Sequence, residues 1–150
     1  MRLLIQRVKM ASVFVEAKII ANIAKGAVIF LGVKKEDNEE DIHYLVDRIL
    51  NLRFFSDASG KFQFSVQDTQ AELLVISQFT LYASCEKGRR PSFEDAASKE
   101  EAQLLYQQFL MQLKKKYTKI EAGQFQASMM IDMCQDGPVS IMLDSSCKKR

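Results

Sequence analysis

The chain of 150 residues is 47% hydrophobic and 27% charged, and its formal net charge at neutral pH is +2. This length and composition are typical of one soluble globular domain with a single core, and the small net charge excludes a strong polyelectrolyte. No apolar run approaches the roughly 20 residues of a membrane-spanning helix. The apolar start of the chain is interrupted too soon for a signal peptide, so we expect a cytoplasmic protein that binds no membrane.

Strands are predicted throughout the first 33 residues. Residues 3–8 and 19–23 have the composition of short strands, and residues 11–15 place alternate apolar side chains on one face. Residues 27–33 are apolar throughout, which is typical of a strand that is buried on both faces of its sheet.

A first helix is predicted after these strands. Asp37 and Glu40 have the D-x-x-E spacing that marks a helix start. Apolar side chains then recur at helical spacing: Ile42, Leu45, Val46, Ile49 and Leu50. His43 falls on the polar face of this helix, so we expect an exposed histidine and not a catalytic base. Residues 57–60 predict a hairpin turn, with a returning strand over 62–66.

The next segments predict a second buried strand and a second helix. Residues 73–76 are wholly apolar and lead into the polar segment 77–81. Ser98 and Glu101 have the spacing of a capping box. An apolar stripe at helical spacing follows this box: Ala102, Leu105, Tyr106, Phe109, Leu110 and Leu113.

Two strands joined by a turn are predicted at the end of the chain. Residues 127–133 alternate as a strand, residues 136–138 form a turn, and residues 139–143 alternate as the last strand. We expect Cys134, which continues the first of these strands, to lie in the core. Many strands with two helices in separate places predict an α+β fold, in which the helices pack on a curved sheet or barrel.

Few side chains offer acid–base, nucleophilic or metal chemistry. The three cysteines form no CxxC pair, and one histidine cannot complete the usual four-ligand set of structural zinc, so we expect no metal and no cofactor. The single histidine also nearly excludes a Ser-His-Asp triad, and no glycine-rich phosphate loop is present. The hydroxyls of Ser77, Thr80 and Ser140 either hydrogen-bond backbone at strand ends or bind a ligand. A hydrolase with this sequence would depend on backbone groups that position the substrate and stabilise an oxyanion.

Cationic residues gather in three places, and both prolines restrain loops. The cationic clusters are Lys87 with Arg89 and Arg90, residues 114–119, and residues 148–150. The last two clusters suit a solvated helix end and a frayed chain end, with phosphate contact as the alternative. Pro91 and Pro138 remove backbone donors and fix one torsion each, so their two loops are where we look for function.

Three segments together resemble the D-aminoacyl-tRNA deacylase family: Ser-Gln-Phe-Thr-Leu at 77–81, Gly-Arg-Arg-Pro-Ser-Phe at 88–93 and Asp-Gly-Pro-Val-Ser at 136–140. Residues 6–8 with 11–15, residues 31–33 and residues 55–61 are also similar to that family, in order along nearly the whole chain. The resemblance implies a compact β-barrel-like α+β domain over residues 1–144, a short basic tail over 145–150, and a homodimer. It implies an enzyme that hydrolyses the ester of a D-amino acid, or of mischarged glycine, on the 3′-terminal adenosine of tRNA.

The resemblance assigns the chemistry to the segment after the second buried strand. The backbone N–H of Phe79 would help to stabilise the oxyanion, while Ser77 and Gln78 would orient the adenosine and the ester. Thr80 carries the hydroxyl to consider if a protein nucleophile exists. The family is thought to use the 2′-OH of the terminal adenosine in catalysis, so few or no side chains would be essential.

Chiral selection is implied to depend on Gly137 and Pro138. Joined by a cis peptide bond, they would reach into the pocket of the partner subunit and accept hydrogen bonds from the α-ammonium group of the substrate. An L side chain would then strike the backbone, whereas a D side chain would point outward and glycine would pass. The remaining residues implied in substrate binding are Arg7, Pro91, Ser92, Phe93, Val139 and Ser140. Of these, Arg7 and the segment 89–93 would either shape the pocket rim or contact phosphate, with structural support of the dimer as the alternative.

Two positions depart from the family pattern. Gln135 stands where the family usually has Asn, and Ser140 stands where it usually has Thr. Two other interpretations remain beside the enzyme: a nucleic-acid-binding dimer that has lost hydrolysis, to which Gln135 alone points, and a dimeric scaffold that binds no nucleic acid. The intact segments 77–80 and 137–138 favour the enzyme.

Overall fold

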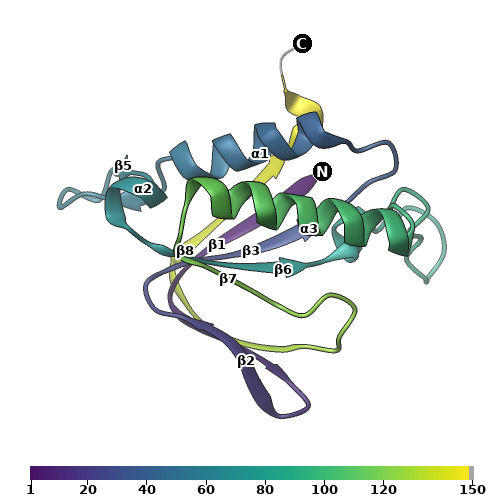
Figure 1. Ribbon diagram of the computed structural model, residues 1–150, viewed down its shortest axis with the longest axis horizontal. Helices are drawn as coiled ribbons and strands as arrows, with labels where there is room; N and C mark the ends of the chain where they lie inside the picture. The colour runs from purple at the N-terminus through teal and green to yellow at the C-terminus, as the bar shows by residue number, and fades with distance from the viewer. Residues whose placement is uncertain (149–150) are drawn as a thin grey trace.

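The computed structural model describes residues 1–148, so Lys149 and Arg150 of the basic chain end lie outside the described residues. Two long helices lie side by side on a mixed, strongly curled sheet (Figure 1). The elements follow in chain order: β1 (Arg2–Val15), β2 (Lys18–Ile23), β3 (Gly26–Gly32), α1 (Glu39–Asn51), β4 (Phe55–Ser56), β5 (Phe62–Phe64), α2 (Val66–Thr69), β6 (Glu72–Ser77), η1 (Phe79–Tyr82), α3 (Lys99–Lys116), β7 (Ile120–Ala122), β8 (Met130–Asp144) and η2 (Ser145–Cys147).

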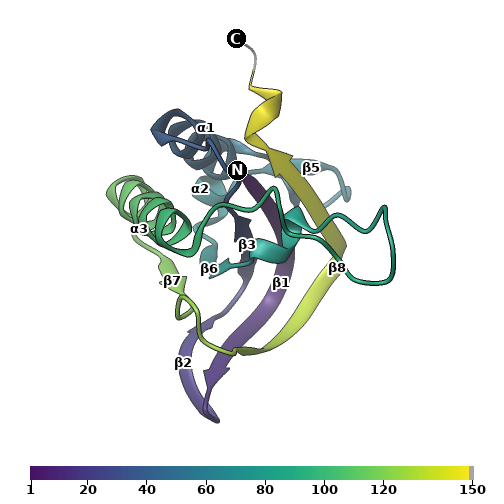
Figure 2. The ribbon, with the colours of Figure 1, turned by 90° about the vertical axis from the view of Figure 1, so that its right-hand side faces the viewer.

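Strand β1 organises the sheet because it pairs along both of its edges. One edge pairs antiparallel with β3 over its first half and with β2 over its second half, and the other edge pairs antiparallel with β8 along nearly its whole length. The parallel strands β3, β6 and β7 extend the sheet from there. Figure 2 shows how the long strands β1 and β8 bend together. The prediction of an α+β fold with a barrel-like sheet is therefore confirmed.

Strands β3 and β6 are buried on both faces, as their apolar runs predict. Alternate residues such as Ile29 and Val75 join a large core between the sheet and the helices. Their neighbours, such as Val28 and Leu74, join a smaller core inside the curl of the sheet, with Val8 of β1. The bend of β1 and β8 encloses this second core. Strands β3 and β6 therefore have a core on each face, so they need no alternation of apolar and polar residues.

Helix α1 begins one residue later than the D-x-x-E spacing predicts, and that helix-start assignment is wrong in detail. Asn38 is the N-cap, and its side chain accepts a hydrogen bond from the backbone N–H of Glu40 at 2.9 Å. The carboxylate of Asp41 accepts from the N–H of Asn38 at 2.9 Å, which completes the capping box. Asp37 instead binds the amino group of Met1. Downstream, the predicted stripe of α1 is buried, and His43 is exposed as expected.

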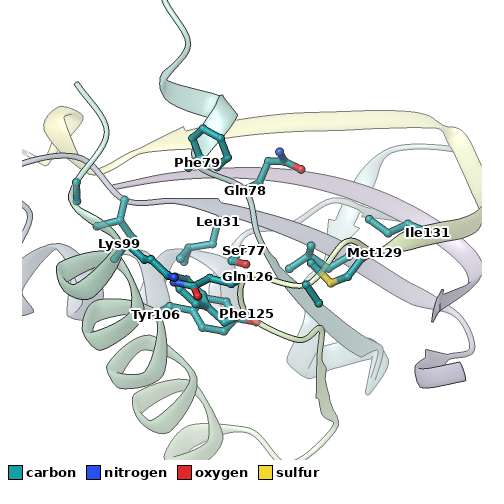
Figure 3. A pocket seen from close by; sticks show the side chains of 15 residues that line it. Leu31, Ser77, Gln78, Phe79, Lys99, Tyr106, Phe125, Gln126, Met129 and Ile131 are labelled. Carbon is teal, nitrogen blue, oxygen red and sulfur yellow. The ribbon is translucent and has the colours of Figure 1, made fainter. Parts of the chain in front are cut away.

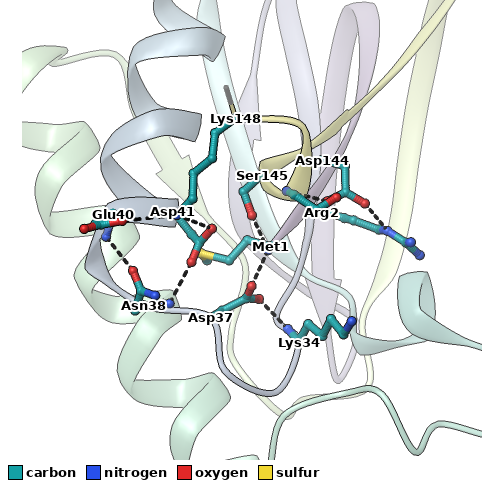
Figure 4. A network of polar contacts seen from close by, with 11 residues as sticks. Met1, Arg2, Lys34, Asp37, Asn38, Glu40, Asp41, Asp144, Ser145 and Lys148 are labelled. Atoms are coloured by element: carbon teal, nitrogen blue, oxygen red, sulfur yellow. Dashed lines mark hydrogen bonds and ion pairs between the residues drawn. The ribbon is translucent and has the colours of Figure 1, made fainter. Parts of the chain in front are cut away.

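Figure 4 shows the polar network that joins the start of β1 to α1 and η2. The amino group of Met1 donates to Asp37 and to the hydroxyl of Ser145. The Lys148 ammonium lies 3.1 Å from the Asp41 carboxylate. Burial raises the pKa of Asp41, but hydrogen bonds from the backbone, Ser145 and Lys148 outweigh it, and the pKa is lowered. Asp41 is therefore charged in the folded protein at neutral pH.

Three of the predictions about strands are wrong. The segment 136–138 is no turn between two strands, because β8 is continuous from Met130 to Asp144 and shifts its register twice against β1. Cys134 is exposed on this strand and not in the core, since alternate residues of β8 point away from the curl. Earlier in the chain, Val66 begins the short helix α2 and does not continue the returning strand.

Helix α3 follows its sequence signals closely. Ser98 and Glu101 form the predicted capping box, and the stripe buries Tyr106, Phe109 and Leu113 most deeply. Its last turn carries three lysines, a placement that the helix dipole favours. None of the described helices is both long and apolar enough to cross a membrane.

Candidate active site

A pocket of about 620 Å³ opens where the parallel strands β3 and β6 end. Figure 3 shows Tyr106 and Phe125 on the side of α3, Met129 and Ile131 on the opposite side, and Phe79 at the start of η1. The remaining lining residues are Leu31, Val33, Ile76, Ser77, Gln78, Ala97, Lys99, Ala102, Gln126 and Ala127. Most of this lining is apolar, and among residues 1–148 Lys99 is its single charged side chain. No Asp, Glu, His or Cys of the described residues lines the pocket, so the lining offers no ordinary side-chain acid–base pair.

The polar segment after β6 forms the edge of this pocket. The backbone N–H of Gln78 donates to Leu31 O at 2.8 Å, which extends the parallel pairing of β3 and β6 by one residue. The first intrahelical bond of η1 runs from the N–H of Leu81 to Gln78 O. The N–H groups of Phe79 and Thr80 precede that bond and have no acceptor within the helix. They are therefore able to donate to a ligand.

Ser77, Gln78 and Phe79 line the pocket, whereas Thr80 lies outside its lining and is exposed. The side-chain amide of Gln78 donates to Thr80 Oγ1 at 2.5 Å. This bond fixes Gln78 relative to η1 and occupies one lone pair of the hydroxyl.

Phe93 contacts this edge from a separate loop. Its ring meets the ring of Phe79 edge-on, with centroids 4.9 Å apart. Ser92 pairs with Ser84 through two backbone hydrogen bonds of 2.8 Å, which closes the loop at its base. Pro91 is exposed on that loop. Of the predicted rim residues, Phe93 therefore lies against the pocket edge, while Pro91 and Ser92 support it from the loop.

Gly137 and Pro138 lie elsewhere, on the exposed side of β8, and they do not line the pocket of their own chain. Their peptide bond is cis, and Gly137 has a φ of +129°. Arg7 lies behind them and is 9% exposed. Its guanidinium donates to Phe54 O at 2.7 Å and lies 3.1 Å from the carboxylate of Asp136. Arg7 thus fastens the glycine–proline segment to the body of the protein.

A second polar contact closes the other side of this segment. The hydroxyl of Ser140 accepts hydrogen bonds from the side-chain amides of Gln135 at 2.9 Å and Gln6 at 3.3 Å. The two positions that depart from the family pattern therefore bond to each other across Gly137 and Pro138. Val139 packs beside Gly137: a Cβ added at Gly137 would lie 2.8 Å from Cγ2 of Val139.

Several lining residues carry no signal in the sequence beyond helix or loop composition. Tyr106 belongs to the predicted stripe of α3, yet its hydroxyl donates to Val75 O at 3.0 Å and its ring packs at a tilt against Phe125, with centroids 5.5 Å apart. Burial raises the pKa of Tyr106 above its usual range, so the hydroxyl is a neutral donor. Gln126 sits in the left-handed region at a φ of +64°, in the segment that leads to β8. Tertiary contacts bring these residues to the pocket, and no sequence motif marks them.

Comparisons with known proteins agree with this architecture. The model of the D-Tyr-tRNA(Tyr) deacylase family matches residues 4–144. A D-aminoacyl-tRNA deacylase of Dictyoglomus turgidum is 49% identical over 150 residues, which cover 100% of this chain and 96% of that protein. One from Aquifex aeolicus is 51% identical over 145 residues, or 97% of this chain and 98% of that protein.

Two solved structures share the fold. A structure described as a c-Myc DNA unwinding element binding protein has a TM-score of 0.91 at 42% identity, and covers 96% of this chain and 98% of its own. A probable eukaryotic D-amino acid tRNA deacylase has a TM-score of 0.82 at 14% identity, and covers 95% of this chain and 97% of its own. With the family model matched along nearly its whole length, the chain belongs to the D-aminoacyl-tRNA deacylase family.

Proposed function

We propose that this protein hydrolyses the ester between a D-amino acid, or mischarged glycine, and the 3′-terminal adenosine of tRNA, and so edits mischarged tRNA. The observation that carries this proposal is the backbone N–H of Phe79, a residue that lines the apolar pocket; like the neighbouring N–H of Thr80, it has no acceptor in η1. Family membership supplies the substrate class.

The pocket suits one end of such a substrate. Its volume of about 620 Å³ falls in the range of small-molecule sites. Apolar and aromatic side chains enclose its interior, which suits a flat base, and Ser77 and Gln78 at its edge offer hydrogen bonds to the ribose and the ester. The ester carbonyl is then placed next to the N–H groups of η1.

Catalysis in this proposal depends on backbone donors and on the substrate itself. In the part of the chain that the structure describes, no carboxylate, histidine or cysteine lines the pocket, so the lining supplies no general base. The 2′-OH of the terminal adenosine takes that part by orienting the attacking water. The N–H groups of η1 stabilise the oxyanion, and one such donor typically contributes a factor of about 10²–10³ in rate. In this proposal Thr80 only positions Gln78 and is not the nucleophile. We therefore expect Thr80→Ala to retain much of the activity.

Chiral selection requires a second copy of the chain. Gly137 and Pro138 are exposed and lie outside the pocket of their own chain, and Arg7 and Ser140 hold them from two sides. In a homodimer they enter the pocket of the partner subunit, where their carbonyl oxygens accept from the α-ammonium group. Exposed methionines on β1 and β8 supply apolar surface for such a contact: Met10, Met130 and Met142.

The test is deacylation of D-Tyr-tRNA, L-Tyr-tRNA and Gly-tRNA by the purified protein, with its mass in solution measured by sedimentation. Hydrolysis of the D and glycyl esters by a dimer, with the L ester spared, is the expected result. Equal hydrolysis of D and L esters would overturn the selection mechanism. A dimer that binds tRNA and hydrolyses none of the three would overturn the enzymatic function.

That last outcome would favour nucleic-acid binding without hydrolysis as a second candidate function. The description of the 42%-identical structure as a DNA-element binding protein favours this candidate. Salt-sensitive tRNA binding without turnover would then be expected.

A further inference from the structure

We propose that the basic loop, residues 85–91, binds phosphates of the single-stranded 3′ end of the tRNA through Lys87, Arg89 and Arg90. This inference rests on the proposed function, because it concerns the same substrate at the same pocket. It adds a phosphate-binding surface outside that pocket.

The base of the basic loop is fixed next to the pocket. The two backbone hydrogen bonds between Ser84 and Ser92 close the loop, and Phe93 follows at once and packs edge-on against Phe79. Because Phe79 lines the pocket, the loop starts and ends at the pocket edge. Figure 2 shows the segment between η1 and α3 projecting from the body of the protein.

The tip of the loop presents three cations without local partners. Lys87, Arg89 and Arg90 are exposed, and the ion pairs among the described residues include none of them. Gly88 has a φ of +72° and open space around it, which lets the backbone turn between these cations. Elsewhere, Arg2, Arg7 and Lys148 are each paired with a carboxylate.

The other exposed basic cluster has an explanation of its own. Lys114, Lys115 and Lys116 form the last turn of α3, where cations interact favourably with the helix dipole. The pocket lies at the opposite end of that helix, beside Lys99 and Ala102. No helix dipole acts on the cations of the basic loop, and their position next to the pocket makes them available to an anionic ligand.

The length of the basic loop determines which phosphates of the tRNA its tip can contact. Four residues from Ser92 to Gly88 span at most about 13 Å when extended. A stacked strand advances about 3.4 Å per nucleotide. With the terminal adenosine in the pocket, the tip therefore reaches phosphates of roughly the last three or four nucleotides. Glu86 and Glu94, which are exposed on either side of these cations in the sequence, repel phosphate and so favour its contact with Lys87, Arg89 and Arg90.

The experiment compares two triple variants that each remove three exposed positive charges. One is Lys87→Ala/Arg89→Ala/Arg90→Ala, and the matched control is Lys114→Ala/Lys115→Ala/Lys116→Ala. Three D-tyrosyl esters serve as substrates: adenosine, the trinucleotide CCA with a 5′-phosphate, which carries three phosphates, and full tRNA. We expect the loop variant to lower kcat/KM on the trinucleotide and on tRNA alike, with no such loss on the adenosine ester, which has no phosphate.

The salt dependence of kcat/KM gives the expected size of the effect. Three phosphate contacts on a single strand contribute a slope of about −2 in log K against log salt. Between 50 and 200 mM salt, kcat/KM of the unmodified protein on the trinucleotide should therefore fall about 20-fold more than that of the loop variant. An equal loss on the adenosine ester, a loss confined to full tRNA, or an equal loss in the control variant would each overturn the proposal.

A failure of the proposed function remains distinguishable. If the unmodified protein hydrolyses no ester, binding of a 5′-labelled RNA minihelix that ends in CCA still tests the loop by fluorescence anisotropy. A salt slope that is smaller by about 2 in the loop variant supports the proposal without turnover. Equal slopes in both proteins overturn it.

Discussion

The substitution Gly137→Ala tests the glycine–proline segment most directly. At a φ of +129°, any residue with a Cβ is strained by on the order of 1–3 kcal/mol. The new Cβ would also lie 2.9 Å from the backbone nitrogen of Val139, which is too close to a group that cannot rotate away. We therefore expect the segment to move, although the core beneath it stays intact.

Gly60→Ala is the matched control. Gly60 has a φ of +84°, but a Cβ there would meet nothing within 4 Å, so this variant carries the backbone strain without the clash. Since both variants carry the strain, only the clash separates them, and forcing a methyl group into filled space costs about 1–3 kcal/mol. We therefore expect the two variants to differ by about 2 kcal/mol in the free energy of unfolding, which is about 1 M in the urea midpoint. Both proteins are unfolded at one fixed concentration, because dimerisation would make the midpoint depend on it.

Activity gives the second readout. A loss of 1.4 kcal/mol in transition-state binding lowers kcat/KM tenfold. We expect Gly137→Ala to lose at least tenfold on D-Tyr-tRNA and to discriminate less between D and L esters, while Gly60→Ala keeps both. This reasoning would be refuted if the Gly137→Ala protein had the same urea midpoint as Gly60→Ala and kept its full preference for the D ester.

Three other substitutions follow from single contacts. Arg7→Met leaves the carboxylate of Asp136 without its cation, and urea unfolding should show a loss of about 2–3 kcal/mol; an unchanged midpoint would contradict the role of Arg7 as a fastener. Phe93→Ala removes the edge contact with Phe79, so we expect less than about 1.5 kcal/mol of destabilisation but a raised KM for tRNA in steady-state assays. Although burial opposes it, hydrogen bonds lower the pKa of Asp41, so its stabilisation is present above the unfolded pKa of about 3.9 and is lost as the pH falls through the lower folded value. Asp41→Asn should flatten the acid limb of stability in urea titrations from roughly pH 5 down to pH 2, and an unchanged limb would count against this assignment.

Local sequence signals predicted the elements that carry their own pattern. Strand β3 carries apolar side chains on both faces, so neither face is suited to contact with water. The two cores cover these faces. The capping box at Ser98 and the stripe of α3 depend only on residues within one or two turns, which is why they could be predicted from the sequence. The start of α1 shows the limit, because Asp37 and Asn38 compete for the cap and a contact with Met1 decides between them.

The candidate site divides in the same way. The sequence indicated Ser77, Gln78 and Phe79 through a polar segment after an apolar strand, and all three line the pocket. It did not indicate Tyr106 or Phe125 as lining, because they reach the pocket from distant parts of the chain.

By itself, the sequence determined which segments are strands or helices, the curved α+β architecture and the resemblance to one family, since these depend on local periodicity and on ordered motifs. Only the tertiary structure decided that residues 130–144 form one strand paired along β1, because register and curl depend on partners far away in the sequence. That pairing exposes Cys134 and sets Gly137 and Pro138 outside the pocket of their own chain, since alternate side chains of a strand must face opposite ways.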